Sequence, residues 1–342
     1  MDLRTTFTIP PSSAKITYHT PVIFIGSCFA TSIGRHMEMG RIPVLINPFG
    51  TVYNPVSVIN TLRVVADGKS YSADNIYNSE GRWISFSHYT DFTSEDPTRL
   101  LDKINDNIKN AHNFLSGAKF LFVTFGTAWI YTWNKTGEVV SNCHKLPASE
   151  FTRRLLSVDE VTALWSDQIE RLNSVFPDLK VIFTVSPVRH WKDGAHGNQI
   201  SKSVLLLAIE ELQKHPLSPG YFPAYELVMD DLRDYRFYDT DMLHLSESAV
   251  EYVWDAFAKC FIDEVTMSTY NEVLKISRAV MHRIQSDSSH TKRFARNMIE
   301  KINDLKKKYP FLDLETERAY FSAILEQAFI PYSGNRSTQL PD

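Results

Sequence analysis

The sequence predicts an α/β fold in which a five-stranded parallel sheet lies between two layers of helices. Two observations predict it. Nearly continuous apolar runs of strand length recur between residues 21 and 230, and segments with a helical spacing of apolar residues separate them. Strands that are apolar throughout are buried on both faces, which is typical of parallel strands covered by helices.

The expected strands and helices alternate along the chain as far as residue 261. The strands are expected at 21–26, 42–48, 119–127, 179–187 and 224–230. The helices are expected at 29–39, 55–67, 95–116, 157–174, 198–214 and 246–261. A polar, aromatic excursion at 69–94 and a hairpin at 128–140 interrupt this order. The order fits a three-layer domain of the flavodoxin-like kind.

The composition changes from about residue 264, where two amphipathic helices are expected. We therefore expect an α/β domain at 1–263 and a helical C-terminal extension at 264–342. The extension would pack on the main domain or form a contact in a homo-oligomer. The cationic run 306–308 is interpreted as a solvated helix end rather than a nucleic-acid patch, because no basic and aromatic pattern elsewhere supports it.

Composition and charge narrow the class of protein. The formal net charge is −4 and the pI is about 6.3, so nothing at the level of the whole chain attracts nucleic acid or an anionic membrane. Three scattered cysteines do not make a disulfide framework. No signal peptide and no membrane-spanning run is recognised. We expect a cytoplasmic protein that needs no cofactor.

The carboxyl ends of the expected strands carry polar residues and glycines. In open parallel sheets this edge, beside the point where strand order reverses, is where ligands bind. The residues that follow the first four strands are Ser27, Asn47 with Gly50, Gly126, and Arg189 with His190. We therefore expect the site at this edge.

Ser27 stands where the first strand ends and a helix begins. A serine needs a general base and donors for the oxyanion it creates before it can act as a nucleophile. The N–H groups at a helix N-terminus are suited to hold that oxyanion. The alternative is a serine that only caps the helix.

Asp241 and His244 stand three residues apart, just before the helix expected at 246–261. In a turn, such a carboxylate can fix the tautomer of the imidazole and stabilise its cation. The alternative is a turn-capping aspartate beside an ordinary surface histidine. Alone, this spacing is a weak signal.

Together, the Gly-Ser pair and the Asp-x-x-His motif resemble the SGNH (GDSL-like) hydrolases. The stretch "GSCFA" at 26–30 resembles the GSCFA family within that group more closely still. Further blocks of the resemblance are "NPFGTVYNP" at 47–55, "TFGTAWIY" at 124–131, "NCHK" at 142–145, "SPVRH" at 186–190 and "NQISK" at 198–202. The resemblance covers residues 20 to 260 and implies the SGNH hydrolase fold.

The resemblance implies a catalytic triad and part of an oxyanion hole. Ser27 would be the nucleophile, His244 the base, and Asp241 the residue that orients the base. The N–H groups of Ser27 and Gly50 would donate to the oxyanion. Cys28 is intrinsically the better nucleophile, but adjacent side chains diverge at such a turn, so we expect Cys28 to be a packed thiol.

The third block departs from the family pattern in the oxyanion hole. Where G-x-N-D is usual, this chain has Gly126-Thr127-Ala128-Trp129, so the asparagine donor is missing. Loss of one such donor costs about 3 kcal/mol of transition-state stabilisation. The candidates to replace it are Asn142, Thr127 and Asn54, of which Asn142 is favoured because a hairpin could fold back over the site.

Several other side chains are candidates for substrate binding. They are Arg189, His190, His144 and Trp129. The aromatic residues Trp83, Trp129, Tyr131 and Trp133 would form a stacking platform for a sugar or pack the hairpin onto the domain. A metal site is not expected, because no pair among His144, His190, His196, Cys143 and His244 has a metal-ligand spacing.

The combined interpretation is a serine hydrolase of the SGNH type that acts on a carboxylic ester through an acyl-enzyme. A carbohydrate acetyl-ester is one substrate that this fold accommodates, by analogy of fold only. The alternatives are an acyltransferase that uses the same triad, a ligand-binding module that has lost turnover, and a scaffold that associates through its C-terminal helices. No nucleic-acid or membrane partner is expected.

Overall fold

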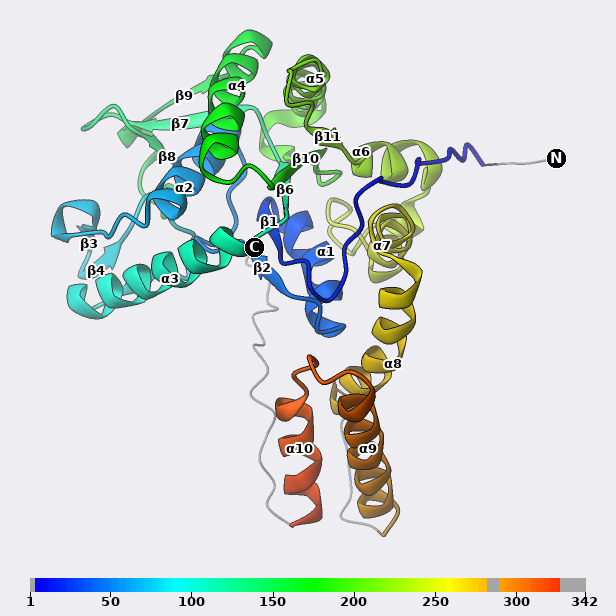
Figure 1. The fold of residues 1–342 in the computed structure, drawn as a ribbon. Coiled ribbons are helices and arrows are strands. Elements are labelled where there is room, and N and C mark those ends of the chain that lie inside the picture. Colours follow the sequence, from blue (N-terminus) through cyan, green and yellow to red (C-terminus); the bar gives the residue numbers. More distant parts are fainter. Residues whose placement is uncertain (1–3, 282–288, 327–342) are drawn as a thin grey trace. The chain divides into compact units, whose positions relative to one another are not determined.

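The computed structural model describes residues 4–281 and 289–326 (Figure 1). The chain divides into two compact units, one of residues 1–36 with 43–262 and one of residues 37–42 with 263–342. Within the extension expected at 264–342, residues 282–288 and 327–342 lie outside the described residues.

The first unit contains a five-stranded parallel sheet in the order β11-β10-β6-β1-β2. Its strands are β1 (Val22–Gly26), β2 (Val44–Ile46), β6 (Phe120–Phe125), β10 (Lys180–Val185) and β11 (Gly220–Tyr221). At the carboxyl end of β1, Gly26 lies opposite Thr124 of β6. The α/β class with a five-stranded parallel sheet is confirmed.

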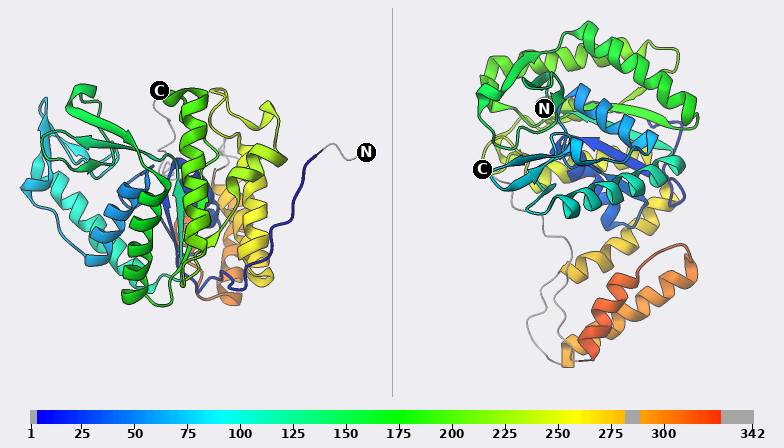
Figure 2. Two further views of the ribbon diagram at one scale, coloured as in Figure 1. Left: turned by 90° about the horizontal axis from the view of Figure 1, so that it is seen from above. Right: turned by 90° about the vertical axis from the view of Figure 1, so that its left-hand side faces the viewer.

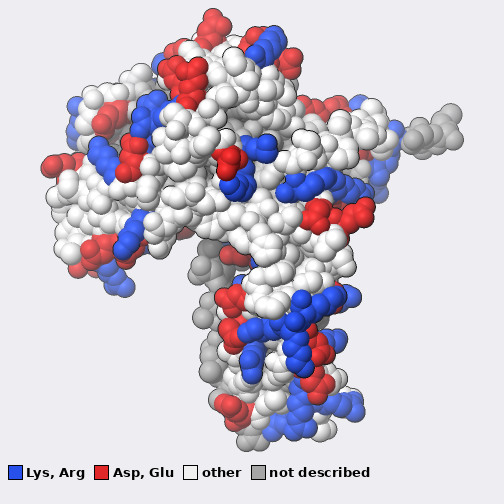
Figure 3. Space-filling view, viewed as in Figure 1, with Lys and Arg blue, Asp and Glu red and all other residues white. Residues whose placement is uncertain are grey.

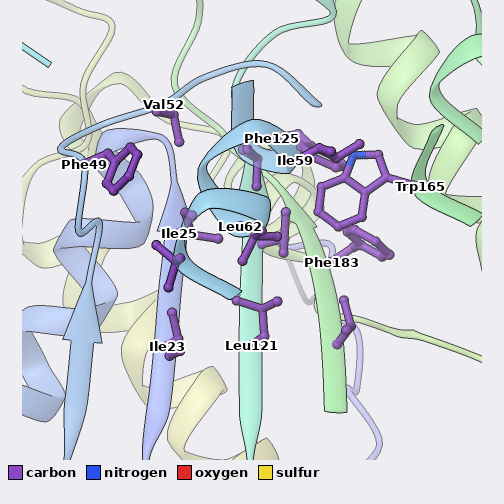
Figure 4. Close-up of a cluster of buried hydrophobic side chains, with 14 of the residues drawn as sticks. Ile23, Ile25, Phe49, Val52, Ile59, Leu62, Leu121, Phe125, Trp165 and Phe183 are labelled. Carbon is purple, nitrogen blue, oxygen red and sulfur yellow. The ribbon is translucent and has the colours of Figure 1, made fainter. Parts of the chain in front are cut away.

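Helices cover both faces of this sheet (Figures 1 and 2). One face carries α2 (Pro55–Asp67), α3 (Pro97–Gly117), α4 (Val158–Val175) and α5 (Gly194–Gln213). Ile25, Leu121 and Phe183 point into this layer, where Trp165 of α4 packs edge-on 5.0 Å from Phe183 (Figure 4). These apolar runs are buried on both sides, as expected of parallel strands.

The opposite face carries α1 (Cys28–Met39) and α7 (Glu247–Phe261). Phe24 of β1 and Phe122 of β6 stack at 4.9 Å there, and Phe257 of α7 packs against both. The two helices therefore pack on the same face of β1 and β6. This places the beginnings of α1 and α7 at the carboxyl edge of the sheet.

The fifth strand differs from the prediction in its position. The run expected as a strand at 224–230 forms α6 (Ala224–Glu226) and a π-helical turn at Leu227–Asp231, and the strand is β11 instead. Pro223 precedes this segment and suits the start of a helix. A short apolar run cannot be assigned to strand or helix by periodicity alone. This is why the strand predicted at 224–230 was wrong.

Two small antiparallel sheets are formed by segments that are inserted between strands of the main sheet. The excursion forms β3 (Tyr77–Ser79), β4 (Arg82–Ile84) and β5 (Thr93–Ser94), and the hairpin forms β7 (Trp129–Trp133) and β8 (Val139–Val140) with β9 (Phe151–Leu155). Phe86 joins them, because its ring lies 4.6 Å from that of Trp133 and its carbonyl accepts the Ser141 N–H. Trp133 thus packs the hairpin against the excursion.

The second unit is helical, with α8 (Glu264–Met281), α9 (Ser289–Lys308) and α10 (Glu315–Leu325). Met298, Ile302 and Leu305 are buried along one stripe of α9. The Glu317 carboxylate is buried and is paired with Arg41. A buried carboxylate needs such a partner.

The cationic end of α9 is matched by acidic side chains. Lys306 pairs with Glu315, Lys307 lies 3.7 Å from Asp304, and Lys308 lies 3.3 Å from Glu272. Figure 3 shows basic and acidic side chains next to one another over these helices. Interspersed charges of this kind are typical of a solvated helix surface. In the described residues, no helix has both the length and the apolar character needed to cross a membrane.

Candidate active site

Gly26 allows β1 to turn directly into α1. Its φ of +137° is unfavourable for any residue with a side chain, and a Cβ here would lie 2.1 Å from the Thr124 carbonyl oxygen. Its N–H donates to Asn47 Oδ1 at 2.7 Å, which ties the turn to the loop after β2. Only glycine fits this close approach of two chain segments.

Ser27 continues the strand and is buried. Its N–H donates to the Thr124 carbonyl at 3.0 Å, which extends the pairing of β1 with β6 by one residue. Only 1% of Ser27 is exposed, and its Oγ has no hydrogen-bond partner among the described residues. The expected contact between this hydroxyl and His244 is not made.

Cys28, and not Ser27, is the residue that interacts with His244. It is the first residue of α1 and is partly exposed. The interaction of the His244 imidazole with the Cys28 side chain is the largest influence on the ring, and it raises the pKa of His244 to about 9 against the effect of desolvation. Adjacent side chains do diverge at this turn, but the serine faces inward and the cysteine outward.

Asp241 orients the imidazole from its other side. Asp241 Oδ2 lies 2.5 Å from His244 Nδ1, while Oδ1 accepts the N–H groups of Leu243 and His244, each at 2.8 Å. Desolvation opposes the charge of this carboxylate, but these hydrogen bonds outweigh it and lower the pKa of Asp241 to about 2. The carboxylate therefore holds the tautomer that leaves Nε2 for Cys28.

The loop that carries Asp241 and His244 is held at both ends. The Asp239 N–H donates to the His244 carbonyl at 2.8 Å, and Met242 adopts a φ of +60° at the tip. Ser246 caps α7 through the Ala249 N–H. The histidine thus sits directly before a helix that is anchored in the core.

Lys202 of α5 is a completely buried cation near this group. Its Nζ donates to the carbonyls of Gly126 at 2.7 Å and Ser186 at 2.6 Å, which follow β6 and β10. No carboxylate pairs with it in the described part of the chain. Burial lowers the pKa of Lys202 to about 7, while the charge of the Cys28 sulfur opposes that change and Arg189 adds to it.

Two further polar residues of α5 secure the loops around the site. The Asn198 side-chain oxygen accepts the His190 N–H at 2.9 Å. The Ser201 hydroxyl accepts the Ala128 N–H at 2.8 Å and lies 3.0 Å from the Thr127 hydroxyl. One face of α5 therefore fixes the segments that follow β6 and β10.

The backbone donors expected at the oxyanion hole are engaged elsewhere. The Ser27 N–H is bonded within the strand, and the Gly50 N–H closes a turn on the Asn47 carbonyl at 2.8 Å. Gly50 has a φ of +76°, and a Cβ there would lie 2.3 Å from that of Tyr89. The glycine is thus required by the turn. Cys28, as the first residue of a helix, keeps an N–H with no intrahelical acceptor.

The three side chains expected to replace the missing asparagine each make a local hydrogen bond, although for Asn142 the engaged atom is the acceptor oxygen and not the amide donor. Asn54 caps α2, because its oxygen accepts the Ser57 N–H at 2.9 Å and its amide donates to the Ser57 hydroxyl. The Thr127 hydroxyl accepts the Trp129 N–H at 3.1 Å. The Asn142 oxygen accepts the His144 N–H at 2.7 Å in a turn. None of the three makes a recorded contact with Cys28 or His244 in the described residues.

Of the expected substrate-binding residues, Trp129 and His190 line one cavity, whereas His144 and Arg189 do not. His144 Nε2 is bonded to the Ser85 carbonyl at 2.8 Å and so belongs to the excursion. Arg189 contacts Met229 Sδ at 3.5 Å and the hydroxyl of Tyr238. Burial, followed by the charge of Lys202, lowers the pKa of His190 to about 4, so this ring is neutral at pH 7.

A cavity of about 100 Å³ has Cys143 among its lining residues. Its walls include Tyr53, Thr127, Trp129 and His190. The His190 ring lies edge-on 5.2 Å from that of Tyr53. Cys28 contributes, after burial, to the raised pKa of Tyr53, and His244 contributes weakly to the lowered pKa of His190, so two walls of the cavity lie within electrostatic range of the Cys28–His244 pair. No three His, Cys, Asp or Glu side chains in the described ranges are grouped as a metal site would need.

Comparison with protein-family models assigns both parts of the chain. The model of the GSCFA family matches residues 21–257, and that of the GSCFA domain protein C-terminal domain matches residues 273–327. The protein belongs to the GSCFA family. A search of curated proteins returns no match. The GSCFA match includes Cys28, Lys202, Asp241 and His244.

The sequence held two signals for residues that the interpretation of this GSCFA protein missed. When its Gly26-Ser27-Cys28-Phe29 is set under the letters G-D-S-L, Cys28 and not Ser27 falls under the serine. In "NQISK", Asn198, Ser201 and Lys202 have the spacing of one buried helix face. Polar residues at buried positions of a helix must find partners, which makes them candidates for a site.

Proposed function

We propose that this GSCFA protein is a cysteine-dependent acyl hydrolase that cleaves carboxylic esters. Cys28 is the nucleophile, His244 is the general base and acid, and Asp241 orients the imidazole. The observation that carries the proposal is that His244 interacts with the side chain of Cys28, while the hydroxyl of Ser27 is buried without a hydrogen-bond partner among the described residues. The triad geometry inferred for a serine is thus assigned to a thiol.

The electrostatics favour a thiol in this role. The thiolate is the reactive form of cysteine, and it is stabilised by a neighbouring imidazolium and by positive surroundings. The raised pKa of His244, about 9, keeps the ring protonated at neutral pH between the sulfur and Asp241. Lys202, whose charged form interacts with Cys28, adds positive charge as the pH falls through its pKa of about 7.

Acylation follows from this arrangement. The Cys28 thiolate attacks the carbonyl carbon of the ester and forms a carbon–sulfur bond. The tetrahedral oxyanion faces the Cys28 N–H at the beginning of α1 and the positive field of Lys202. As the oxyanion collapses, the carbon–oxygen bond to the leaving alcohol breaks and His244 gives its proton to that oxygen. The product is a thioester on Cys28.

Deacylation returns the enzyme to its starting state. His244, now neutral, takes a proton from water, and the hydroxide attacks the thioester carbon. The carbon–sulfur bond breaks, the carboxylic acid leaves, and the thiolate is restored beside the imidazolium. An alcohol in place of water would make the same chain an acyltransferase, with the same bonds formed and broken.

Variants at the two neighbouring residues test the proposal. Hydrolysis of p-nitrophenyl acetate and mass spectrometry of the acid-quenched enzyme are measured for wild type, Cys28→Ala, Cys28→Ser and Ser27→Ala. We expect Cys28→Ala to lose at least about 10³-fold in kcat/KM and to form no acyl adduct. Ser27→Ala should keep the adduct on Cys28.

The opposite pattern would overturn the assignment. If Ser27→Ala abolishes turnover in a folded protein while Cys28→Ala retains it, the nucleophile is the serine. If wild type forms no adduct with esters or thioesters and binds them without turnover, the protein is a binding module. Circular dichroism and Tm of each variant separate loss of chemistry from loss of the fold.

A further inference from the structure

The cavity lined by Tyr53 and His190 has walls that carry several hydrogen-bond donors. Arg153 of β9 lies with its guanidinium 3.9 Å from the ring centroid of Trp129, and both residues line the cavity. Arg153 Nε and Trp129 Nε1 are buried and have no acceptor among the described residues. Unsatisfied buried donors are costly, so a ligand that supplies acceptors would stabilise this wall.

The charge balance of the cavity is positive. Among the described residues that line it, the cations are Arg153 and Lys192 and the carboxylate is Asp193, whose side chain is buried and paired with Arg153. Lys192 Nζ lies 5.3 Å from the ring of Tyr131 and has no ion pair within the described ranges. The His190 ring adds no charge at pH 7.

The charge of Lys192 reaches the interior of the cavity. It acts on the Cys143 thiol, which also lines this space, and opposes the effect of burial on that group. The cavity volume of about 100 Å³ leaves room for a group several times the size of a water molecule. A small charged substituent fits this space, whereas a long acyl chain does not.

We propose that the cavity binds an anionic group of the substrate, a carboxylate or a phosphate, through Lys192 and the free donors of Arg153 and Trp129. This rests on the proposed function for the role of Cys28, but the binding itself needs no turnover. The substrate is then an ester that carries a negative charge a short distance from the reacting carbonyl.

Protection of thiols from alkylation by iodoacetamide tests this directly on the full-length protein. The rates at Cys28 and Cys143 are followed separately by peptide mass spectrometry. The probes are glutarate for a carboxylate, inorganic phosphate for a phosphate, and glutaramide as the neutral analogue of glutarate. We expect one or both anions to slow alkylation at the two cysteines, and glutaramide to leave the rates unchanged.

Matched lysine variants locate the effect. Lys192→Met should weaken protection by the anion roughly fivefold, as expected for one partly exposed ion pair. Lys180→Met removes the same charge at the amino end of β10, at the opposite edge of the sheet, and should leave protection unchanged. Raising the salt concentration should weaken protection in wild type.

The outcomes separate this inference from the proposed function. Equal protection by glutaramide and glutarate, or none by either anion, would overturn the anionic site. Protection that survives in Lys192→Met would also overturn it. If Cys28 reacts no faster than the buried Cys260 while the anions still protect Cys143, the anionic site stands and the catalytic role of Cys28 fails.

Discussion

Two histidines of the first unit lie next to a nucleophilic side chain, and only one of these two pairs has both a carboxylate partner and partial exposure to solvent. His244 faces the partly exposed Cys28 and is held by Asp241. His88 in the excursion lies 2.8 Å from the Ser85 hydroxyl, but both residues are completely buried. Proximity of an imidazole to a hydroxyl is therefore not sufficient to indicate a nucleophile.

The surroundings of His88 explain the difference. Its ring stacks on Phe49 at 4.0 Å and lies tilted 4.6 Å from that of Phe92, and its Nε2 has no partner in the described residues. Burial lowers the pKa of His88 to about 3, with smaller contributions from His144 and Lys103. A ring that resists protonation, without a carboxylate or access to solvent, serves packing and not acid–base catalysis.

The largest expected effect comes from removing the Asp241 carboxylate beside His244. The Ser85–His88 pair has no such carboxylate. Asp241→Asn keeps the size of the side chain but no longer selects the tautomer or stabilises the imidazolium. We expect kcat to fall roughly 10³–10⁴-fold. Steady-state hydrolysis of p-nitrophenyl acetate measures this. A fall of less than tenfold would mean that His244 does not need Asp241 and would weaken the contrast with His88.

The sequence was sufficient for the α/β class with its parallel sheet and for the contact between Asp241 and His244. Apolar runs predicted the parallel sheet, because a strand that is buried on both faces consists almost entirely of apolar residues. The Asp-x-x-His motif is local, and a turn of three residues brings its carboxylate to its imidazole. Such features depend on neighbours in sequence.

The rest depended on contacts that the sequence does not show. Which of Ser27 and Cys28 faces His244 follows from the φ of Gly26 and from the extra backbone pairing with Thr124. The run at 224–230 became helical because its apolar residues suit either structure. Lys202 reaches two strand ends only once α5 is packed on the sheet.

The next effect concerns stability and not rate. His88→Ala removes a buried ring and its hydrogen bond to Ser85, and we expect the free energy of unfolding to fall by about 2–4 kcal/mol. Urea denaturation followed by fluorescence measures the change. The kcat of the folded fraction should match wild type. A specific loss of kcat with unchanged stability would instead assign His88 to the chemistry.

The smallest effect is a difference in titration, and it tests the electrostatic basis of the comparison. In NMR spectra of the histidine rings, His244 should titrate near pH 9 and His88 should stay neutral down to about pH 3. For His244 the folded pKa lies above the ordinary value of 6.5. Its contribution to stability is therefore complete below pH 6.5 and is lost as the pH rises through 9.

For His88 the sign is reversed, because its folded pKa lies below 6.5. The unfolded chain binds the proton first, so its contribution is present above pH 6.5 and is lost as the pH falls toward 3. Cys28→Ala should lower the pKa of His244, since the sulfur is the largest influence that raises it, and leave that of His88 unchanged. If His244 in wild type titrates near 6.5, or does not respond to Cys28→Ala, the imidazolium–thiolate pair is not formed.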